Sequence, residues 1–264
     1  MISVEVANIA RIKAVQAAYD SKSSHLGSSL SCIDILSVLY CDIADSALIK
    51  SNHIERDRII LSKGHAALAL YSVMETCKIF PEGTLKNFNG LGSVFLGHIS
   101  HHGKIGIEYS SGSLGHGLPY GIGKAHAQKL LNFNGRIYVI ISDGECDEGT
   151  TWESALIARH LGLDNLSVII DRNRLQSIKS TEETLMLEPL EDKWKSFGWQ
   201  VTSIDGHSHR ELLEAFSLND GPTCIIANTI KGKGISFMEN NNLWHYKYPD
   251  FDQLGKAMKE LRDN

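Results

Sequence analysis

Residues 137–145 read Ile-Tyr-Val-Ile-Ile-Ser-Asp-Gly-Glu, and residues 166–173 read Leu-Ser-Val-Ile-Ile-Asp-Arg-Asn. Each stretch opens with an apolar, β-branched run of strand length and closes with polar groups. The residues between them include one stretch with a helical pattern, 151–161. A strand, a helix and a second strand in this order form a βαβ unit with parallel strands. We therefore predict that the two strands, over 136–141 and 166–170, lie side by side.

The alternation of helices and strands extends outward from this unit. Apolar periodicity predicts further helices over 4–19, 32–43, 65–77, 118–130, 189–197, 209–217 and 251–261. It predicts further strands over 58–61, 200–204 and 222–227. Such alternation is typical of an α/β fold, a mostly parallel sheet with helices on both faces. The sequence shows no linker and no internal repeat, so we expect one domain over residues 1–264.

Two segments differ from the periodic pattern. The polar stretch 21–31 is predicted to connect the first two helices, with Ser31 as the N-cap of the second. Residues 81–114 contain seven glycines and no sustained period. A loop of that length inside a compact domain is usually functional.

The charge and cysteine content limit the classes of protein to consider. The net charge is −5 and no stretch concentrates Lys and Arg, so we expect neither nucleic acid nor a membrane as partner. The five cysteines form no C-x-x-C pair, which is typical of reduced cytosolic thiols. The N-terminus lacks a signal-peptide pattern, and the longest apolar runs are too short to span a bilayer. The protein is therefore predicted to be cytoplasmic.

Polar residues follow both strands of the central unit, at the edge where parallel sheets bind ligands. Asp143 follows the first strand and Asn173 the second, so their side chains should converge. Carboxylate and amide oxygens are ligands for Mg²⁺ or Ca²⁺, and phosphate oxygens complete a magnesium octahedron. Gly144 lets the backbone approach a phosphate. The alternative is structural: Asp143-Gly144 is a tight turn, and Asn173 is a cap.

Four of the twelve histidines fall in polar or glycine-rich segments: His25, His65, His98 and His245. A neutral imidazole donates and accepts hydrogen bonds and moves protons near pH 7, which suits a substrate with several hydroxyls. Taken singly, such a histidine is more often a surface or capping residue. The group His98, His101 and His102 has no Cys or acidic partner at ligand spacing, so we do not expect a zinc site.

Five separated motifs resemble those of the transketolases. They are Leu61–His65, Ser111–Gly115, Ser142–Glu145 together with Asn173, Asp147–Glu153, and Lys231–Gly234 followed by His245. The resemblance covers nearly the whole chain, but only the N-terminal half of a full-length transketolase. It implies the thiamine-diphosphate-binding fold of that family.

The resemblance also implies roles for individual positions. It implies a divalent metal, Mg²⁺ or Ca²⁺, bound by Asp143, Asn173 and the Leu175 carbonyl. It implies thiamine diphosphate as the cofactor, contacted by Ser28, His65, Gly112, Ser113, Leu114, Gly144, Asn173, Lys231 and His245. By the same resemblance, the ketose would contact His25, His98 and His245.

Three positions depart from the family's pattern. Ser142 replaces the first Gly of the diphosphate motif, Ile99 replaces the Pro of Gly-His-Pro, and His116 replaces a Gln. The first change affects the geometry of the strand end, and the other two affect which sugar is bound. Glu148 has two open interpretations, a charge at the start of a helix or a residue of the subunit interface. Glu145 is interpreted as solvated or helix-capping.

The resemblance implies one subunit of a two-chain transketolase, which transfers a two-carbon ketol unit from a ketose or ketose phosphate to an aldose. The family residues that contact the aminopyrimidine of the cofactor belong to the C-terminal half. A partner chain resembling that half is therefore expected, most simply with two copies of each chain. Two alternatives stay open: another thiamine-diphosphate lyase or synthase making an unusual sugar, and a non-catalytic homologue that acts as an interaction subunit.

Overall fold

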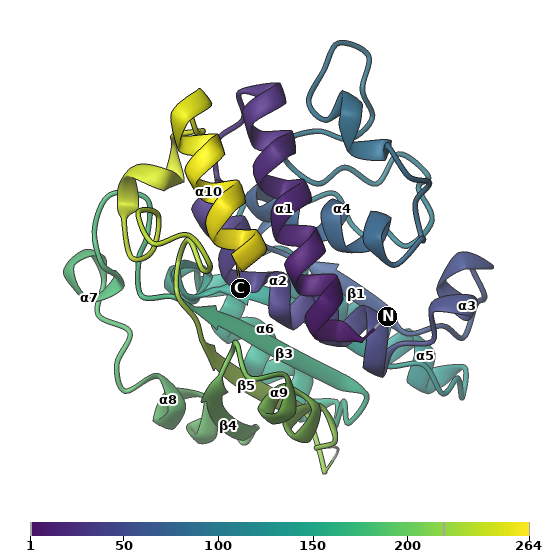
Figure 1. The fold of residues 1–264 in the computed structure, drawn as a ribbon. Coiled ribbons are helices and arrows are strands. Elements are labelled where there is room, and N and C mark those ends of the chain that lie inside the picture. Colours follow the sequence, from purple (N-terminus) through teal and green to yellow (C-terminus); the bar gives the residue numbers. More distant parts are fainter. Residues whose placement is uncertain (1, 219, 264) are drawn as a thin grey trace.

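The structure, a computed structural model, describes residues 2–218 and 220–263. Five parallel strands form one sheet in the spatial order β1-β2-β3-β5-β4 (Figure 1). Their bounds are Arg58–Leu61 (β1), Ile137–Ser142 (β2), Leu166–Arg172 (β3), Gln200–Asp205 (β4) and Thr223–Asn228 (β5). Strands β2 and β3 are neighbours, with Ile137 opposite Leu166 and Ser142 opposite Asp171. The predicted βαβ unit and the α/β fold are thereby confirmed.

Helices cover both faces of the sheet. One face carries α1 (Ser3–Ser21), α2 (Leu26–Val38), α4 (Ala67–Thr76), α9 (His209–Phe216) and α10 (Phe251–Asp263). The other face carries α5 (Gly117–Leu130), α6 (Gly149–His160) and α8 (Leu190–Ser196). The short helices α3 (Ser46–Lys50) and α7 (Thr181–Thr184) were not predicted, because four or five residues are too few to show a period. Leu39–Ile43 is a turn of π-helix, and turns of 3₁₀-helix lie at Gly64–Ala66, Thr84–Asn87, Asp143–Asp147 and Asn242–His245.

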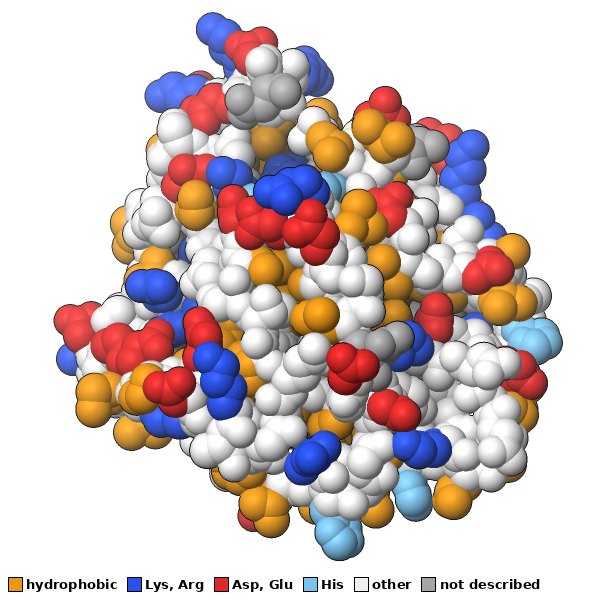
Figure 2. Space-filling model, turned by 90° about the horizontal axis from the view of Figure 1, so that it is seen from below, with side chains coloured by type: hydrophobic (Ala, Val, Ile, Leu, Met, Phe, Trp, Pro, Cys, Tyr) orange, Lys and Arg blue, Asp and Glu red, His pale blue; other side chains and the backbone are white. Residues whose placement is uncertain are grey.

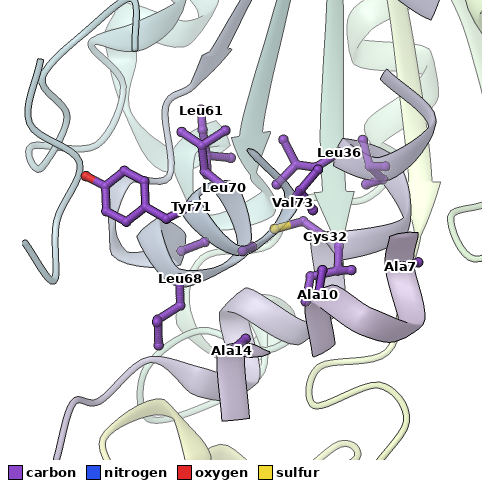
Figure 3. Packing of buried hydrophobic residues seen from close by; sticks show 14 of the residues in the cluster. Ala7, Ala10, Ala14, Cys32, Leu36, Leu61, Leu68, Leu70, Tyr71 and Val73 are labelled. Carbon is purple, nitrogen blue, oxygen red and sulfur yellow. The ribbon is translucent and has the colours of Figure 1, made fainter. Parts of the chain in front are cut away.

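The central strands β2 and β3 are mostly apolar and buried along their whole length because helices cover both of their faces. Successive residues of β2 point to opposite sides: Ile140 joins the core under α1, α2 and α4, whereas Val139 joins the core under α5 and α6. Figure 3 shows the first core, with Ala10 of α1 beside Cys32 of α2. The small alanine side chain lets the two helices pack closely.

The second helix begins at Leu26, and not at residue 32 as predicted. Ser31 is therefore not its N-cap; it lies inside α2, fully buried, where its hydroxyl donates to Asp171 Oδ2 at 2.6 Å. All 13 residues of α2 are buried. A helix that is buried all round has no polar face, so its sequence shows no amphipathic period from which its start could be predicted.

The stretch Leu26–Ile43 is long and apolar enough to cross a membrane when only length and composition are considered. It escapes a search for uninterrupted apolar runs because polar residues such as Ser28, Ser31 and Asp34 interrupt it. Within the fold 83% of this stretch is buried, as expected of a core helix.

The exposed surface mixes charges of both signs. Figure 2, seen from the side of α8, β4 and α9, shows Lys and Arg side chains interspersed with Asp and Glu. Two ion pairs of the chain join residues one helical turn apart, Glu191 with Lys195 at 3.1 Å and Arg210 with Glu214 at 3.0 Å. Exposed pairs of this kind contribute only about 0.3–0.5 kcal/mol each.

Candidate functional site

A cavity of about 290 Å³ opens where the carboxyl ends of β1, β2 and β3 meet. The residues that line it are His25, Ser28, Lys63, His65, His98, Gly112, Leu114, Ser142, Asp143, Gly144, Asn173, Leu175, Gln176, Ser177 and His245. Of the predicted site residues, only Ser113 and Lys231 are not in this lining. Ser113 is exposed, whereas the buried Lys231 places its ammonium 3.2 Å from Nδ1 of the lining residue His245.

Asp143 is buried, and its carboxylate is held from several sides. The backbone N–H of Gly144 donates to Oδ1 at 2.9 Å, and that of Arg174 donates to Oδ2 at 2.6 Å. The guanidinium of Arg172 lies 3.3 Å from Oδ2. Burial raises the pKa of Asp143 to about 6, and the neighbouring Asp171 adds to this rise while Arg172 opposes it.

The oxygen atoms in this part of the cavity fit a hard divalent cation. A carboxylate, an amide and a backbone carbonyl, from Asp143, Asn173 and Leu175, line the same cavity. The Leu175 carbonyl accepts a hydrogen bond from Lys231 Nζ at 3.1 Å, which leaves a second lone pair. A divalent cation beside Asp143 would favour the ionised carboxylate, which burial alone disfavours.

Two glycines of the cavity leave open space beside the backbone. A Cβ atom added at Gly112 would meet no atom within 4 Å, and one added at Gly144 would only touch Gln176 at 3.5 Å. Packing within this chain therefore requires glycine at neither position. A further group that lies close against this backbone, such as a diphosphate, would require glycine at both positions.

Four histidine rings gather in the cavity wall. The ring centroid of His25 lies 5.5 Å from that of His65, 5.6 Å from that of His98 and 4.8 Å from that of His245. Burial lowers the pKa of His25 to about 4 and that of His245 to about 3, and the charge of Lys231 adds to both shifts. Burial also holds the pKa of His65 well below its ordinary value. These three rings are neutral at pH 7, so each can both donate and accept a hydrogen bond.

Lys231 determines which nitrogen of His245 carries the proton. Its ammonium lies 3.2 Å from His245 Nδ1 and donates to the carbonyls of Leu175 and Gln176 at 3.1 and 2.8 Å. Because an ammonium can only donate, His245 Nδ1 accepts and Nε2 carries the proton. Burial lowers the pKa of Lys231 to about 8, so its charge is largely retained at pH 7.

His25 is held in a strained conformation at the start of α2. Its φ of 68° lies in the left-handed region, which costs roughly 1–2 kcal/mol for a residue with a side chain. The backbone N–H of His25 donates to the His245 carbonyl at 2.8 Å. The buried Nδ1 of its ring has no hydrogen-bond partner among the described residues. An unpaired buried nitrogen in a cavity wall is a candidate contact for a ligand.

A buried ion pair at this end of the sheet was not predicted from the sequence. Lys63 and Asp171 are in direct contact, with side chains 1% and 0% exposed. Asp171 also accepts from the hydroxyls of Ser31 and Thr229, and Lys63 donates to the Ser28 carbonyl at 3.0 Å. The pair therefore joins α2, the residues after β1, strand β3 and the residue after β5. The sequence shows a charged residue, Asp171, at the end of an apolar strand. It does not show that Lys63 is the partner of that residue in space.

Glu145 is fully buried, so its interpretation as a solvated residue is wrong. It accepts hydrogen bonds from the Ser62 hydroxyl and from the N–H groups of Ser142 at 2.8 Å and Gly115 at 3.0 Å. The capping interpretation is confirmed, because Ser142 and Glu145 form a capping box on the turn that follows β2. Ser142 has φ −85°, a conformation open to any residue, so the strand end accommodates its side chain.

The other two departures from the family pattern, Ile99 and His116, do not line the cavity. The N–H of Ile99 donates to the Gly64 carbonyl at 3.3 Å, a bond that Pro could not make, and this fixes the chain beside His98. His116 is exposed and lies outside the lining. Glu148 is also exposed, and its side chain makes no capping bond to α6 within the described part of the chain. Its role at an interface stays a prediction.

Comparison with known families places these observations in context. A family model described as "Transketolase, thiamine diphosphate binding domain" matches residues 2–251. The chain is 37% identical over 257 residues to one of the subunits of the apulose-4-phosphate transketolase of Phocaeicola vulgatus, covering 96% of this chain and 91% of that protein. It is 39% identical over 241 residues to the 6-deoxy-6-sulfo-D-fructose transketolase subunit SqwG of a Clostridium species, covering 90% and 88%.

Solved structures show the same fold. The transketolase of Campylobacter jejuni matches with a TM-score of 0.84 and 28% sequence identity. The match covers 98% of this chain and 42% of that chain, so this chain spans less than half the length of the solved enzyme.

Breaking the buried pair should destabilise the fold. Lys63→Met leaves Asp171 buried without its cation, which should lower the free energy of unfolding by about 3–5 kcal/mol. Urea unfolding followed by circular dichroism measures this. Lys195→Met, which breaks an exposed pair, is the control and should cost no more than about 0.5 kcal/mol. The double variant Lys63→Met/Asp171→Leu should recover part of the loss, and a cost in Lys63→Met equal to that of the control would contradict the argument.

Proposed function

Because the chain belongs to the transketolase family, we propose that it is the diphosphate-binding subunit of a two-chain transketolase. In this proposal the enzyme transfers a two-carbon ketol unit from a ketose or ketose phosphate to an aldose acceptor, in the cytoplasm. The whole of residues 1–264 acts as one thiamine-diphosphate-binding domain. One observation carries the proposal: the oxygen donors suited to a metal and the neutral histidines suited to a sugar line a single cavity.

The proposed contacts divide between the metal and the cofactor. Asp143, Asn173 and the Leu175 carbonyl bind the metal, and Mg²⁺ suits a site with one carboxylate whose coordination is completed by diphosphate oxygens. The remaining cofactor contacts come from Ser28, His65, Gly112, Ser113, Leu114, Gly144, Lys231 and His245. The positive charge that Lys231 largely retains at pH 7 supports its contact with a diphosphate.

Thiamine diphosphate, when bound, supplies the carbanion chemistry that cleaves and forms carbon–carbon bonds. The protein's own part is to orient the sugar and to exchange protons with it. The neutral ring of His25, whose Nδ1 has no partner among the described residues, can donate to a carbonyl oxygen or accept from a hydroxyl group, and the ring of His245 can donate through Nε2. His98, exposed at the cavity mouth, is proposed as a third sugar contact.

A partner chain completes the site in this proposal. Two relatives of this chain are themselves named as subunits. We infer a partner that resembles the C-terminal part of a transketolase, in an assembly with two copies of each chain. Closing the cavity with a second chain would exclude water and strengthen the electrostatic interactions inside it.

Reconstitution tests the proposal directly. This chain, a co-encoded chain resembling the C-terminal half of transketolase, and the mixture of both are assayed with thiamine diphosphate, MgCl₂, a ketose donor and an aldose acceptor. Only the mixture should transfer the two-carbon unit, and light scattering should give the mass of two copies of each chain. Turnover by this chain alone would contradict the two-chain proposal. A mixture that associates but turns over no ketose would contradict transketolase activity.

Asp143→Asn should abolish metal-dependent cofactor binding without unfolding the protein. The amide keeps the shape of the carboxylate but loses the charge that attracts the cation, so cofactor affinity should fall by more than about 100-fold. Isothermal titration of the assembled enzyme with thiamine diphosphate and Mg²⁺ measures the affinity, and thermal unfolding checks the fold. Asp164→Asn, which changes an exposed carboxylate, should bind as wild type. Unchanged affinity in Asp143→Asn would rule out the metal assignment.

His98→Ala should slow turnover and leave cofactor affinity unchanged, because the proposal places His98 on the sugar side. Loss of a donor to developing charge typically lowers kcat by about 10²–10³-fold. Steady-state kinetics and cofactor titration of the assembled enzyme separate the two effects. His160→Ala, which removes an exposed histidine at the end of α6 and outside the cavity, is the matched control. A parallel loss of cofactor affinity in His98→Ala would instead place this ring at the cofactor.

A further inference from the structure

Two of the five cysteines lie against each other. The Sγ atoms of Cys41 and Cys77 are 3.5 Å apart and share a hydrogen bond, and both thiols are free. Both residues are half-buried, whereas Cys32, Cys146 and Cys224 are buried. A disulfide needs its sulfurs at about 2 Å, so a small movement of the side chains would turn this contact into a bond. The pair is 36 positions apart, so no C-x-x-C motif in the sequence predicts it.

The packing of two helices holds the thiols together. Helices α2 and α4 lie side by side in the core beside α1 (Figure 3). Cys41 follows α2 in the π-helical turn Leu39–Ile43, and Cys77 directly follows α4. The N–H of Ala44 donates back to the first residue of that turn at 2.8 Å, and the N–H of Cys77 donates to the Val73 carbonyl at 2.8 Å. Both thiols are therefore placed by ordered helix ends.

The environment of the pair differs from that of the other cysteines. Burial raises the pKa of Cys32 to about 12 and holds those of Cys146 and Cys224 well above the ordinary value. The hydrogen bond from the Cys77 thiol lowers the pKa of Cys41, and the same bond, together with burial, raises the pKa of Cys77. The thiolate is the reactive form of cysteine. Cys41 is therefore the nucleophile of the pair, and Cys77 is the second thiol.

We propose that Cys41 and Cys77 are a modification site, which a low-molecular-weight disulfide such as glutathione disulfide oxidises reversibly. The Cys41 thiolate attacks one sulfur of glutathione disulfide, whose S–S bond breaks and releases one glutathione. Cys77 then loses its proton and attacks the Cys41 sulfur, and the mixed disulfide breaks to release the second glutathione. The two protein thiols lose two electrons, one glutathione disulfide gains them, and the two protons pass to the released glutathiones.

The bond stabilises the fold and leaves the cavity open. It closes a loop over residues 41–77, which contains β1 and the cavity residues Lys63 and His65, and such a closure restricts the unfolded chain. The cavity residue Ser28 lies at the opposite end of α2 from Cys41, about 20 Å along the helix axis. The site goes beyond the proposed function and does not depend on it.

Oxidation of the full chain by glutathione disulfide tests the proposal. The reduced protein is incubated with this probe, and its thiols are counted under denaturing conditions together with its intact mass. The wild type should fall from five thiols to three and lose the mass of two hydrogen atoms, and dithiothreitol should reverse both changes. Its midpoint of thermal unfolding should rise by roughly 5–10 °C on oxidation.

Single variants identify the two partners. In Cys77→Ser one glutathione should stay attached to Cys41, because no second thiol displaces it. Cys41→Ser should form no internal disulfide, and its unfolding midpoint should not shift. Cys224→Ala, the matched control, changes a buried cysteine outside the pair and should oxidise as the wild type does. If circular dichroism shows that a serine variant does not fold, the alanine variant at the same position replaces it.

Two results would overturn the inference. One is a wild-type chain that keeps all five thiols in excess glutathione disulfide. The other is a double variant, Cys41→Ser/Cys77→Ser, that still loses two thiols and gains the same thermal stability. Both measurements are made without sugar or cofactor, so their outcome is independent of the reconstitution that tests transketolase activity.

Discussion

The arrangement of the cavity at the carboxyl ends of β1, β2 and β3 depends on one buried ion pair, Lys63 with Asp171. Taking two charges out of water costs several kcal/mol for each, so such a pair persists only when its remaining hydrogen-bonding groups are also used. Here Asp171 accepts from two hydroxyls as well as from Lys63. Those partners come from α2 and from the residue after β5. The positions of Ser28, His65, Asn173 and Lys231 are thus set by segments that meet at one point.

The cavity contains both positively charged lysines and neutral histidines. Lys63 and Lys231 provide positive charge, and together with burial they lower the pKa of His245. The same environment that suits a diphosphate therefore keeps this ring neutral, so that Nδ1 accepts from Lys231 and Nε2 is left to donate to a sugar oxygen. A protonated ring could not accept from Lys231. The cavity can serve an anionic group and a polyhydroxylated one because Lys63 and Lys231 stay charged while His25, His65 and His245 stay neutral.

Much of the site could be predicted from the sequence, because parallel strands place their carboxyl ends at one edge of a sheet. That rule, with the resemblance to transketolases, was enough to bring Asp143 and Asn173 together and to name most of the lining. It failed where packing outweighed local preference. Local pattern predicts a helix cap at Ser31, which lies inside a fully buried helix. It also allows a solvated Glu145, which is instead buried, caps the turn after β2 and accepts from three other residues.

The sequence by itself determined the order of strands and helices, the parallel sheet, and the chemical types of the groups at its edge. These properties depend on neighbouring residues, through apolar periodicity and the polar residues that follow each strand. Only the tertiary structure decided which charges pair, which nitrogen of His245 carries a proton, and that four histidines line one cavity. Such properties depend on distances through space, as between Lys63 and Asp171, which are 108 positions apart in the chain and in contact in the fold.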